Sequence, residues 1–429
     1  MMCKFIQHLT LCLVFPNLLW GASYYVDPAN GDMSNPGTIE LPWKTLEQVL
    51  SQRKAFEAGD TIILRSGYHG AIYLNSENNN YVTIEAMKGE SPKVSRIQIG
   101  KARFWHIKGI SISPENAKEY VRRTLVDISE HASDISIENC MIFSVKDSSD
   151  WSANDWVKKS CFAIVIRGPR IRVANNHLLN VGCGIINVGE HNLVENNVIE
   201  NYSGDGIQAQ GNDCVYRHNI IKNCYNVDDN HDDGIQSWSV GQGGVGTGTV
   251  KNVVIEANII INNSDPNQKY KGTPQGIGCF DGFYENWLIA NNIVVVDHWH
   301  GITLGGARNC KIINNTVVDI KQGEPGPPWI VIDKHKNGSK STGNLIRNNL
   351  AKTFPSKPEI GQMDHNIVIT NYDDFFVNYK KFDFRLKPGC PACDAGSNEG
   401  ITEKDFLRKK RLHGDTVDVG AIEFIPESR

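Results

Sequence analysis

The chain has 429 residues, with 44 Lys and Arg against 48 Asp and Glu, for a net charge of −4. Its 40% hydrophobic content is enough to bury a large core, so a wholly disordered chain is excluded. The nearly balanced charge argues against general nucleic-acid binding, which requires a strongly basic face.

The first 22 residues are predicted to be a signal peptide. Lys4 supplies a short positive region, residues 9–15 are apolar, and small residues follow at 21–23. Because Pro16 interrupts an apolar run shorter than a spanning helix, a cleaved signal is favoured over a membrane anchor. We therefore expect residues 1–22 to be removed, and the mature chain to be secreted or periplasmic with no membrane span.

A strand and a short helix are predicted next. Residues 24–28 have a strand-forming sequence, and residues 43–52 predict a helix with Thr45 and Gln48 as a capping box. The apolar stripe of this helix is Leu46, Val49 and Leu50. Such a helix would cover the open end of a repeat structure.

One asparagine recurs through the middle of the chain among β-branched residues. Its positions are Asn176, Asn197, Asn219, Asn258, Asn292, Asn315 and Asn349. The base period of about 22 residues, without helical periodicity, is typical of a parallel β-helix. Stacked asparagines at a turn can hydrogen-bond from coil to coil.

A second column fixes the register. A Gly-Ile pair follows each of Cys183, Asp205, Asp233, Gln275 and His300. The isoleucines should point inward and the flanking variable residues outward, so Asp205 and Asp233 should lie on neighbouring coils about 4.8 Å apart. We expect these carboxylates to form an exposed cluster.

Long intervals in the asparagine series locate the expected groove. The extra residues lie at 225–230, 239–249, 264–273 and 321–328. Insertions on adjacent coils of a repeat protein can wall a binding groove, although simple surface decoration is the alternative.

Several motifs resemble those of a known superfamily. They are Tyr-Tyr-Val-Asp-Pro at 24–28, Pro-Trp-Lys-Thr-Leu at 42–46, Gly-Asp-Thr-Ile-Ile-Leu at 59–64, and the closing segment 386–396. With them the mature chain, residues 23–429, resembles the right-handed parallel β-helix superfamily of secreted polysaccharide lyases, which includes pectate lyases, alginate lyases and chondroitinase B. The resemblance implies an all-β, single-stranded right-handed β-helix. Hydrolases, epimerases and phage tailspikes share this scaffold.

The acidic cluster is the predicted metal site. Asp205, Asp232 and Asp233 match the calcium ligands of metal-dependent pectate lyases, so the resemblance implies a Ca²⁺ cofactor. Stacked like charges must be offset, and Ca²⁺, a shared proton or nearby cations are the three physical solutions.

The catalytic base is less determined. A lyase must neutralise a uronate carboxylate, remove the now more acidic α-proton and assist the leaving oxygen. The pectate lyase pattern places a lysine in a Gly-apolar-Lys segment, where this chain has Gly-Ile-Gly at 276–278. The candidate catalytic residues are therefore Lys271, His300, His231 and Asp233.

Basic, amide and aromatic residues flank this centre. The candidate substrate-binding residues are Arg167, Gln208, Gln236, Trp238, Lys269, His298, Lys334 and His335. Phe280, Tyr284, Trp299 and Trp329 are available for stacking on sugars. The combination indicates a groove for an anionic polysaccharide of alginate or pectate type, bound by a monomer that does not bind nucleic acid.

Other functions stay open beside the expected lyase. The segments that begin at Asp205 and His231 also resemble polygalacturonase-type hydrolases, in which Asp205, Asp232 and Asp233 would activate water with inversion. The Arg-Ile-Lys motif of that family is absent. A uronate epimerase or a non-catalytic glycan-binding β-helix are further alternatives.

Nine cysteines follow the predicted signal peptide. Cys140, Cys224 and Cys310 recur in one Asn-Cys context, where a small buried thiol would pack. Cys390 and Cys393 have redox spacing, but no strand–helix unit surrounds them, so packing is favoured there as well.

Overall fold

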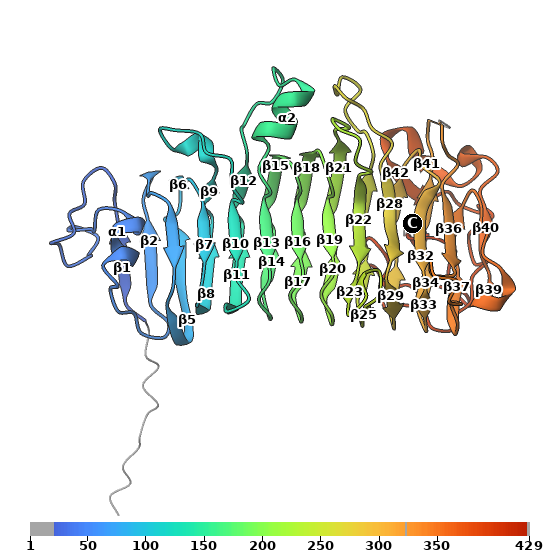
Figure 1. The fold of residues 1–429 in the computed structure, drawn as a ribbon. Helices are drawn as coiled ribbons and strands as arrows, with labels where there is room; N and C mark the ends of the chain where they lie inside the picture. Colours follow the sequence, from blue (N-terminus) through green and yellow to red (C-terminus); the bar gives the residue numbers. More distant parts are fainter. Residues whose placement is uncertain (1–20, 322–323, 427–429) are drawn as a thin grey trace, which may run out of the picture.

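The computed structural model describes residues 21–321 and 324–426. Nearly all of the predicted signal peptide, residues 1–22, lies outside these ranges. Three long sheets of parallel strands stack along one axis and enclose a continuous apolar core (Figure 1). The predicted parallel β-helix is therefore confirmed.

The ten-stranded sheet carries most of the residues discussed below. Its strands in spatial order are β4 (Ile72–Leu74), β7 (Ile97–Ile99), β10 (Val126–Ile128), β13 (Ile164–Ile166), β16 (Ile185–Asn187), β19 (Ile207–Ala209), β22 (Asp233–Trp238), β28 (Gln275–Asp281), β32 (His300–Gly305) and β36 (Trp329–Asp333).

The other two long sheets complete each coil. A thirteen-stranded sheet runs from β1 (Ser23–Val26) to β39 (Gly361–Asp364) and includes β17 (Leu193–Glu195), β20 (Val215–Arg217) and β26 (Val254–Glu256). A twelve-stranded sheet runs from β3 (Gly67–Tyr68) to β40 (Ile367–Val368) and includes β27 (Ile259–Ile261), β31 (Ile293–Val295), β35 (Thr316–Val318) and β38 (Leu350–Ala351).

The Gly-Ile register is confirmed. Ile207 pairs with Ile235, Ile235 with Ile277, and Ile277 with Ile302, and all four side chains are fully buried. One apolar column thus faces the core.

The asparagine ladder is also confirmed, and it reaches one coil further, to Asn366. Both the backbone N–H and Nδ2 of Asn258 donate to Asn292 Oδ1, at 2.9 and 3.0 Å, and Nδ2 also donates to the Tyr216 carbonyl at 2.9 Å. The residue before each rung has positive φ, for example 59° at Asn291. Asparagine tolerates this left-handed region better than most residues, which explains the recurring Asn-Asn doublet.

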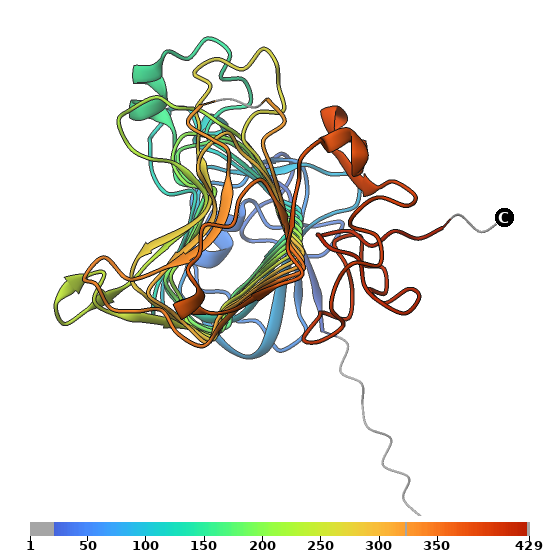
Figure 2. The same ribbon diagram turned by 90° about the vertical axis from the view of Figure 1, so that its right-hand side faces the viewer.

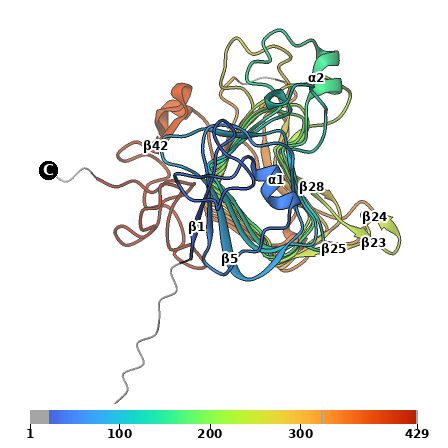
Figure 3. The ribbon, with the colours of Figure 1, turned by 90° about the vertical axis from the view of Figure 1, so that its left-hand side faces the viewer.

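The N-terminal end of the coils is covered by helix α1 (Leu46–Ser51) (Figure 3). Thr45 is the N-cap and accepts from the Gln48 N–H at 3.2 Å, while Leu46 and Val49 are buried. The helix is shorter than the predicted 43–52, because Trp43 instead forms a bridge with Val26 of β1.

Two features outside the coils were not predicted. Helix α2 (Ala153–Lys159) lies between β12 (Met141–Phe143) and β13, and its Trp156 stacks on Tyr225 at 4.5 Å. Residues 369–426, here called the C-terminal layer, fold back beside the coils and include β41 (Phe376–Asn378) and β42 (Asp383–Leu386) (Figure 2). A second apolar cluster joins this layer to outward side chains of β27, β31, β35 and β38.

The insertion at 239–249 forms a hairpin of β23 (Val240–Gly241) and β24 (Gly244–Val245), which projects from the coil wall (Figure 3). Cys140, Cys224 and Cys310 are buried free thiols, as expected. Within the described ranges, no helix is both long and apolar enough to span a membrane.

Candidate active site

The column before the Gly-Ile pairs places two aspartates on neighbouring coils. Asp205 precedes β19 and Asp233 begins β22, and the Asp233 N–H donates to Asp205 Oδ1 at 3.0 Å. The expectation that these carboxylates are exposed was wrong. Asp205 is 4% exposed, Asp232 7% and Asp233 fully buried, because their neighbours cover them.

Amide side chains from the same coils donate to one oxygen of each aspartate in the column. Gln208 Nε2 donates to Asp205 Oδ2 and Gln236 Nε2 donates to Asp233 Oδ2, both at 2.8 Å. The two glutamines, predicted to bind substrate, are thus engaged with the acids. Burial raises the pKa of Asp205 to about 8 and that of Asp232 to about 7, and it also raises the pKa of Asp233.

The calcium ion shared by the three aspartates stays a prediction. Asp232 Oδ1 and Asp233 Oδ1 are buried and accept no hydrogen bond in the described residues, whereas the other four carboxylate oxygens are engaged. Asp232 turns toward Cys224, whose thiol donates to its Oδ2 at 3.4 Å. In the described part of the chain, the three carboxylates do not place one oxygen each within 4.8 Å of one another, whereas one ligand atom each of Glu190, His191 and Asp213 meets this limit. Ca²⁺ takes 6–8 oxygen ligands, whereas both oxygens of Asp205 already accept hydrogen bonds.

His231 is the accessible member of the acidic centre. Its side chain is 61% exposed, and its Nδ1 lies 3.1 Å from Asp233 Oδ2. An ionised Asp233 accepts from Nδ1–H, which leaves Nε2 of the neutral ring with a free lone pair. The hydrogen bond with Asp233 raises the pKa of His231. The pair can therefore accept a proton at Nε2 and stabilise the resulting imidazolium.

Two further histidines lie beside this pair. The backbone N–H of His300 donates to His298 Nδ1 at 3.1 Å. A neutral His298 ring therefore carries its proton on Nε2. His300 Nδ1 lies 3.0 Å from Thr303 Oγ1. Burial lowers the pKa of His300 to about 4 and also lowers that of His298, so both rings are neutral near pH 7.

Two hollows that share Phe280 open at His231 and at His300. The smaller, of about 230 Å³, is lined by His231, Gln236, Ser237, Trp238, Val245, Phe280 and Asp281. The larger, of about 690 Å³, shares Phe280 and includes His300, Thr303 and Trp329, together with Lys334, Lys336, Lys340 and Lys357. Trp299 stacks nearly parallel to Trp329 and is 44% exposed. We call the two hollows together the groove.

Some predicted site residues lie outside the groove. Lys271 Nζ donates to the Pro266 carbonyl of its own loop at 2.6 Å, and Lys269 Nζ donates to the Ser149 carbonyl. Arg167 lies three coils before Asp233 and pairs with Asp127 at 2.5 Å. His335 is buried against Phe283, with ring centroids 4.3 Å apart.

The structure also adds residues that sequence reasoning missed. Gln275 lies directly beside Asp233 in the register, and its position before a Gly-Ile pair was a usable signal. Lys340 and Lys357 lie outside every repeated motif, so no pattern pointed to them.

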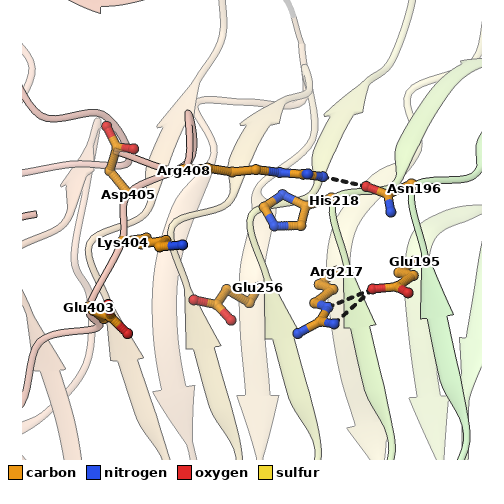
Figure 4. Close-up of a pocket in the computed structure, with 9 residues that line it drawn as sticks. All are labelled: Glu195, Asn196, Arg217, His218, Glu256, Glu403, Lys404, Asp405 and Arg408. Atoms are coloured by element: carbon orange, nitrogen blue, oxygen red, sulfur yellow. Dashed lines mark hydrogen bonds and ion pairs between the residues drawn. The ribbon is translucent and has the colours of Figure 1, made fainter. Parts of the chain in front are cut away.

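A separate hollow of about 400 Å³ lies between the thirteen-stranded sheet and the C-terminal layer (Figure 4). Arg217 pairs with Glu195 at 2.8 Å, and Arg408 donates to Asn196 at 2.5 Å. The Arg408 bond joins residues 403–408 to the coils, and none of the groove residues lines this hollow.

Comparison with known proteins agrees with the observed architecture. The family model described as "right handed beta helix region" matches residues 162–351. The solved structure of XylC with xylose is 12% identical and covers 94% of this chain and 98% of that chain, with a TM-score of 0.57. The Dettilon tailspike protein is 15% identical, and the match covers 82% of this chain and 67% of the tailspike chain, with a TM-score of 0.52. Pectate lyase Pel9A is 14% identical, and the match covers 94% of this chain and 96% of the lyase chain, with a TM-score of 0.45.

These similarities establish the fold, and the predicted right-handed parallel β-helix is confirmed. Polysaccharide lyases and a glycoside hydrolase are both among the proteins with similar structures. At identities of 12–15% the comparison does not choose between these activities.

Proposed function

We propose that the chain is a secreted polysaccharide lyase that cleaves an anionic, uronic-acid-containing polysaccharide by β-elimination. One observation carries this proposal: the accessible His231, backed by the buried Asp233, opens onto a groove whose far end is lined by four lysines. Lysine ammonium groups and aromatic rings in one groove suit a chain of sugars that carry carboxylates.

Each group has a task in this reaction. His231 Nε2 removes the proton α to the uronate carboxylate, and Asp233 stabilises the imidazolium that forms. The electrons of that C–H bond form a carbon–carbon double bond as the adjacent glycosidic C–O bond breaks, and a proton returns to the leaving oxygen. His298, with its proton on Nε2, donates to the carboxylate or to the leaving oxygen.

Calcium is the sequence-based alternative for neutralising the carboxylate. When bound, such an ion would act as a Lewis acid toward the carboxylate. Because the oxygens of Asp205 already accept hydrogen bonds from the Gln208 amide and the Asp233 N–H, we assign this task to His298 and to the lysines of the groove.

An inverting hydrolase is the second candidate. The raised pKa values of Asp205 and Asp232, about 8 and 7, would keep a general acid protonated near neutral pH. Both side chains are less than 8% exposed, however, and a general acid must reach the glycosidic oxygen. This burial favours the lyase.

The test is incubation with alginate, pectate and glycosaminoglycans, followed by ultraviolet absorbance of unsaturated ends and by assay of reducing ends. We expect both signals to rise. A rise in reducing ends alone would indicate the hydrolase, and no rise on any substrate would indicate a binding protein. His191→Ala, at an exposed turn outside the groove, is the matched control for histidine variants.

Export and a monomeric state belong to the same proposal. N-terminal sequencing of protein from the periplasm or culture medium should begin near residue 23. Light scattering should report the mass of one chain.

A further inference from the structure

Two cysteines of the C-terminal layer lie in unusually close contact. Cys390 and Cys393 occupy one tight turn, in which the Cys393 N–H donates to the Cys390 carbonyl at 3.0 Å. Their sulfur atoms are 3.0 Å apart. This is shorter than the about 3.5–4.0 Å at which non-bonded carbon atoms pack, although sulfur is the larger atom.

The other described cysteines differ from this pair. Cys140, Cys161, Cys183, Cys214, Cys224, Cys279 and Cys310 are all buried within the coils. Their sulfur hydrogen bonds in the described residues join backbone groups, an asparagine amide, the Tyr120 hydroxyl or Asp232, and none joins two sulfurs. The close sulfur contact is thus particular to the C-terminal layer.

The turn occupies a structural junction of that layer. Cys390 and Ala392 belong to the apolar cluster that packs against the outer side of the coils. The Ala392 carbonyl accepts from the Val419 N–H at 2.9 Å, so the turn links the exit of β42 to the last buried segment. A covalent bond here would close the turn itself, next to the apolar cluster.

We propose that Cys390 and Cys393 form a disulfide when the protein meets an oxidant of the disulfide class, such as an oxidised dithiol protein or glutathione disulfide. The inference does not depend on the proposed lyase activity. It revises the sequence-based view that these cysteines only pack, while the absence of a strand–helix unit around them still argues against a redox enzyme.

The reaction balances as two successive exchanges. The more exposed Cys393 loses its proton and attacks the oxidant, whose S–S bond breaks to release one thiol and leave a mixed disulfide. Cys390 then loses its proton, attacks the Cys393 sulfur and displaces the second thiol. Two electrons pass to the oxidant, and its two sulfurs leave as thiols.

Burial and the neighbouring Cys390 raise the pKa of the Cys393 thiol. The thiolate is the attacking species, so spontaneous oxidation should be slow at neutral pH and faster at alkaline pH.

The test uses the full mature chain and glutathione disulfide. After treatment, the protein is denatured, alkylated and digested without reduction, and its peptides are measured by mass spectrometry. We expect a peptide that holds both Cys390 and Cys393, unmodified and two hydrogens lighter than its reduced form, with the other seven cysteines alkylated. Alkylation of both residues, or linkage of either one to another cysteine, would overturn the proposal.

Two variants test the order of attack. Cys390→Ser should trap Cys393 as a glutathione adduct, whereas Cys393→Ser should leave the buried Cys390 as a free thiol. Cys140→Ser, a buried cysteine of the coils, is the control and should leave the linkage unchanged. An adduct on Cys390 in place of Cys393 would contradict the order.

Discussion

Two columns of like polar residues run along this β-helix, one of asparagines and one of aspartates. They differ in where their side chains find hydrogen-bond partners. In the asparagine ladder each amide both donates to the next coil and accepts from the previous one. In the aspartate column the carboxylates only accept, so they depend on donors from Gln208, Gln236 and His231. The asparagine amides bond to one another and so stabilise the coils. The aspartates need donors from other residues, and one of these donors is the imidazole of His231, which they hold in place.

The largest expected effect concerns the aspartate column. We expect His231→Ala and Asp233→Asn each to lower turnover by at least about 100-fold, because both remove the positioned proton acceptor. Steady-state kinetics on the best anionic polysaccharide provides the measurement. Lys271→Ala, whose ammonium is bound within its own loop, is the control and should stay within about twofold of wild type. A large loss in the lysine variant would move the base back to that loop.

The next effect concerns the ladder. Asn258→Asp replaces a buried donor that serves both Asn292 Oδ1 and the Tyr216 carbonyl, and it brings acceptor oxygens together. We expect a loss of about 3 kcal/mol in the free energy of unfolding, measured by urea denaturation. Asn267→Asp, on an exposed loop, should change the stability by less than about 0.5 kcal/mol. Equal stabilities of the two variants would contradict the structural role of the ladder.

A smaller effect on turnover is expected at Gly278, where β28 lies against the Asp233 carboxylate. A Cβ at Gly278 would lie 2.3 Å from Asp233 Oδ1, so Gly278→Ala must displace the carboxylate that orients His231. We expect turnover to fall by about tenfold with little change in KM. At Gly305, on the next coil, a Cβ would meet nothing nearer than 3.6 Å, and Gly305→Ala should keep wild-type turnover. Equal turnover in both variants would show that Asp233 need not lie against Gly278.

A further effect concerns the pH dependence of stability. Burial raises the pKa of Asp205 and Asp232 in the folded protein from 3.8 to about 8 and about 7. The folded state therefore binds more protons than the unfolded state between these values, and its stability should fall as the pH rises from about 4 to about 8. Melting temperatures should show this decline, and Asp205→Asn should reduce it. A stability that instead rises with pH over this range would indicate ionised carboxylates held by a cation.

The sequence predicted those parts of the molecule that repeat. The Asn-Asn doublets and Gly-Ile pairs recur on successive coils, and so the ladder, the inward isoleucines and the neighbouring positions of Asp205 and Asp233 could be placed. Helix α2 and the C-terminal layer follow no period, and neither was predicted.

The site was predicted only in part for the same reason. The burial of Asp233 could not be read from the repeat pattern alone, and Lys357 reaches the groove from a segment without a motif. Lys271 and His335 were plausible site residues by type. Residue spacing could not show that Lys271 bonds within its own loop or that His335 packs on the Phe283 ring, each outside the groove.

The most direct test of the central claim is chemical rescue of His231→Ala by imidazole. If the His231 ring is the proton acceptor, added imidazole should restore the formation of unsaturated product in a concentration-dependent way. The same treatment should not rescue Asp233→Asn, in which the original ring is still present. Failure of imidazole to restore any activity in His231→Ala, in a variant that remains folded and binds the polysaccharide, would contradict the assignment of His231 as the base.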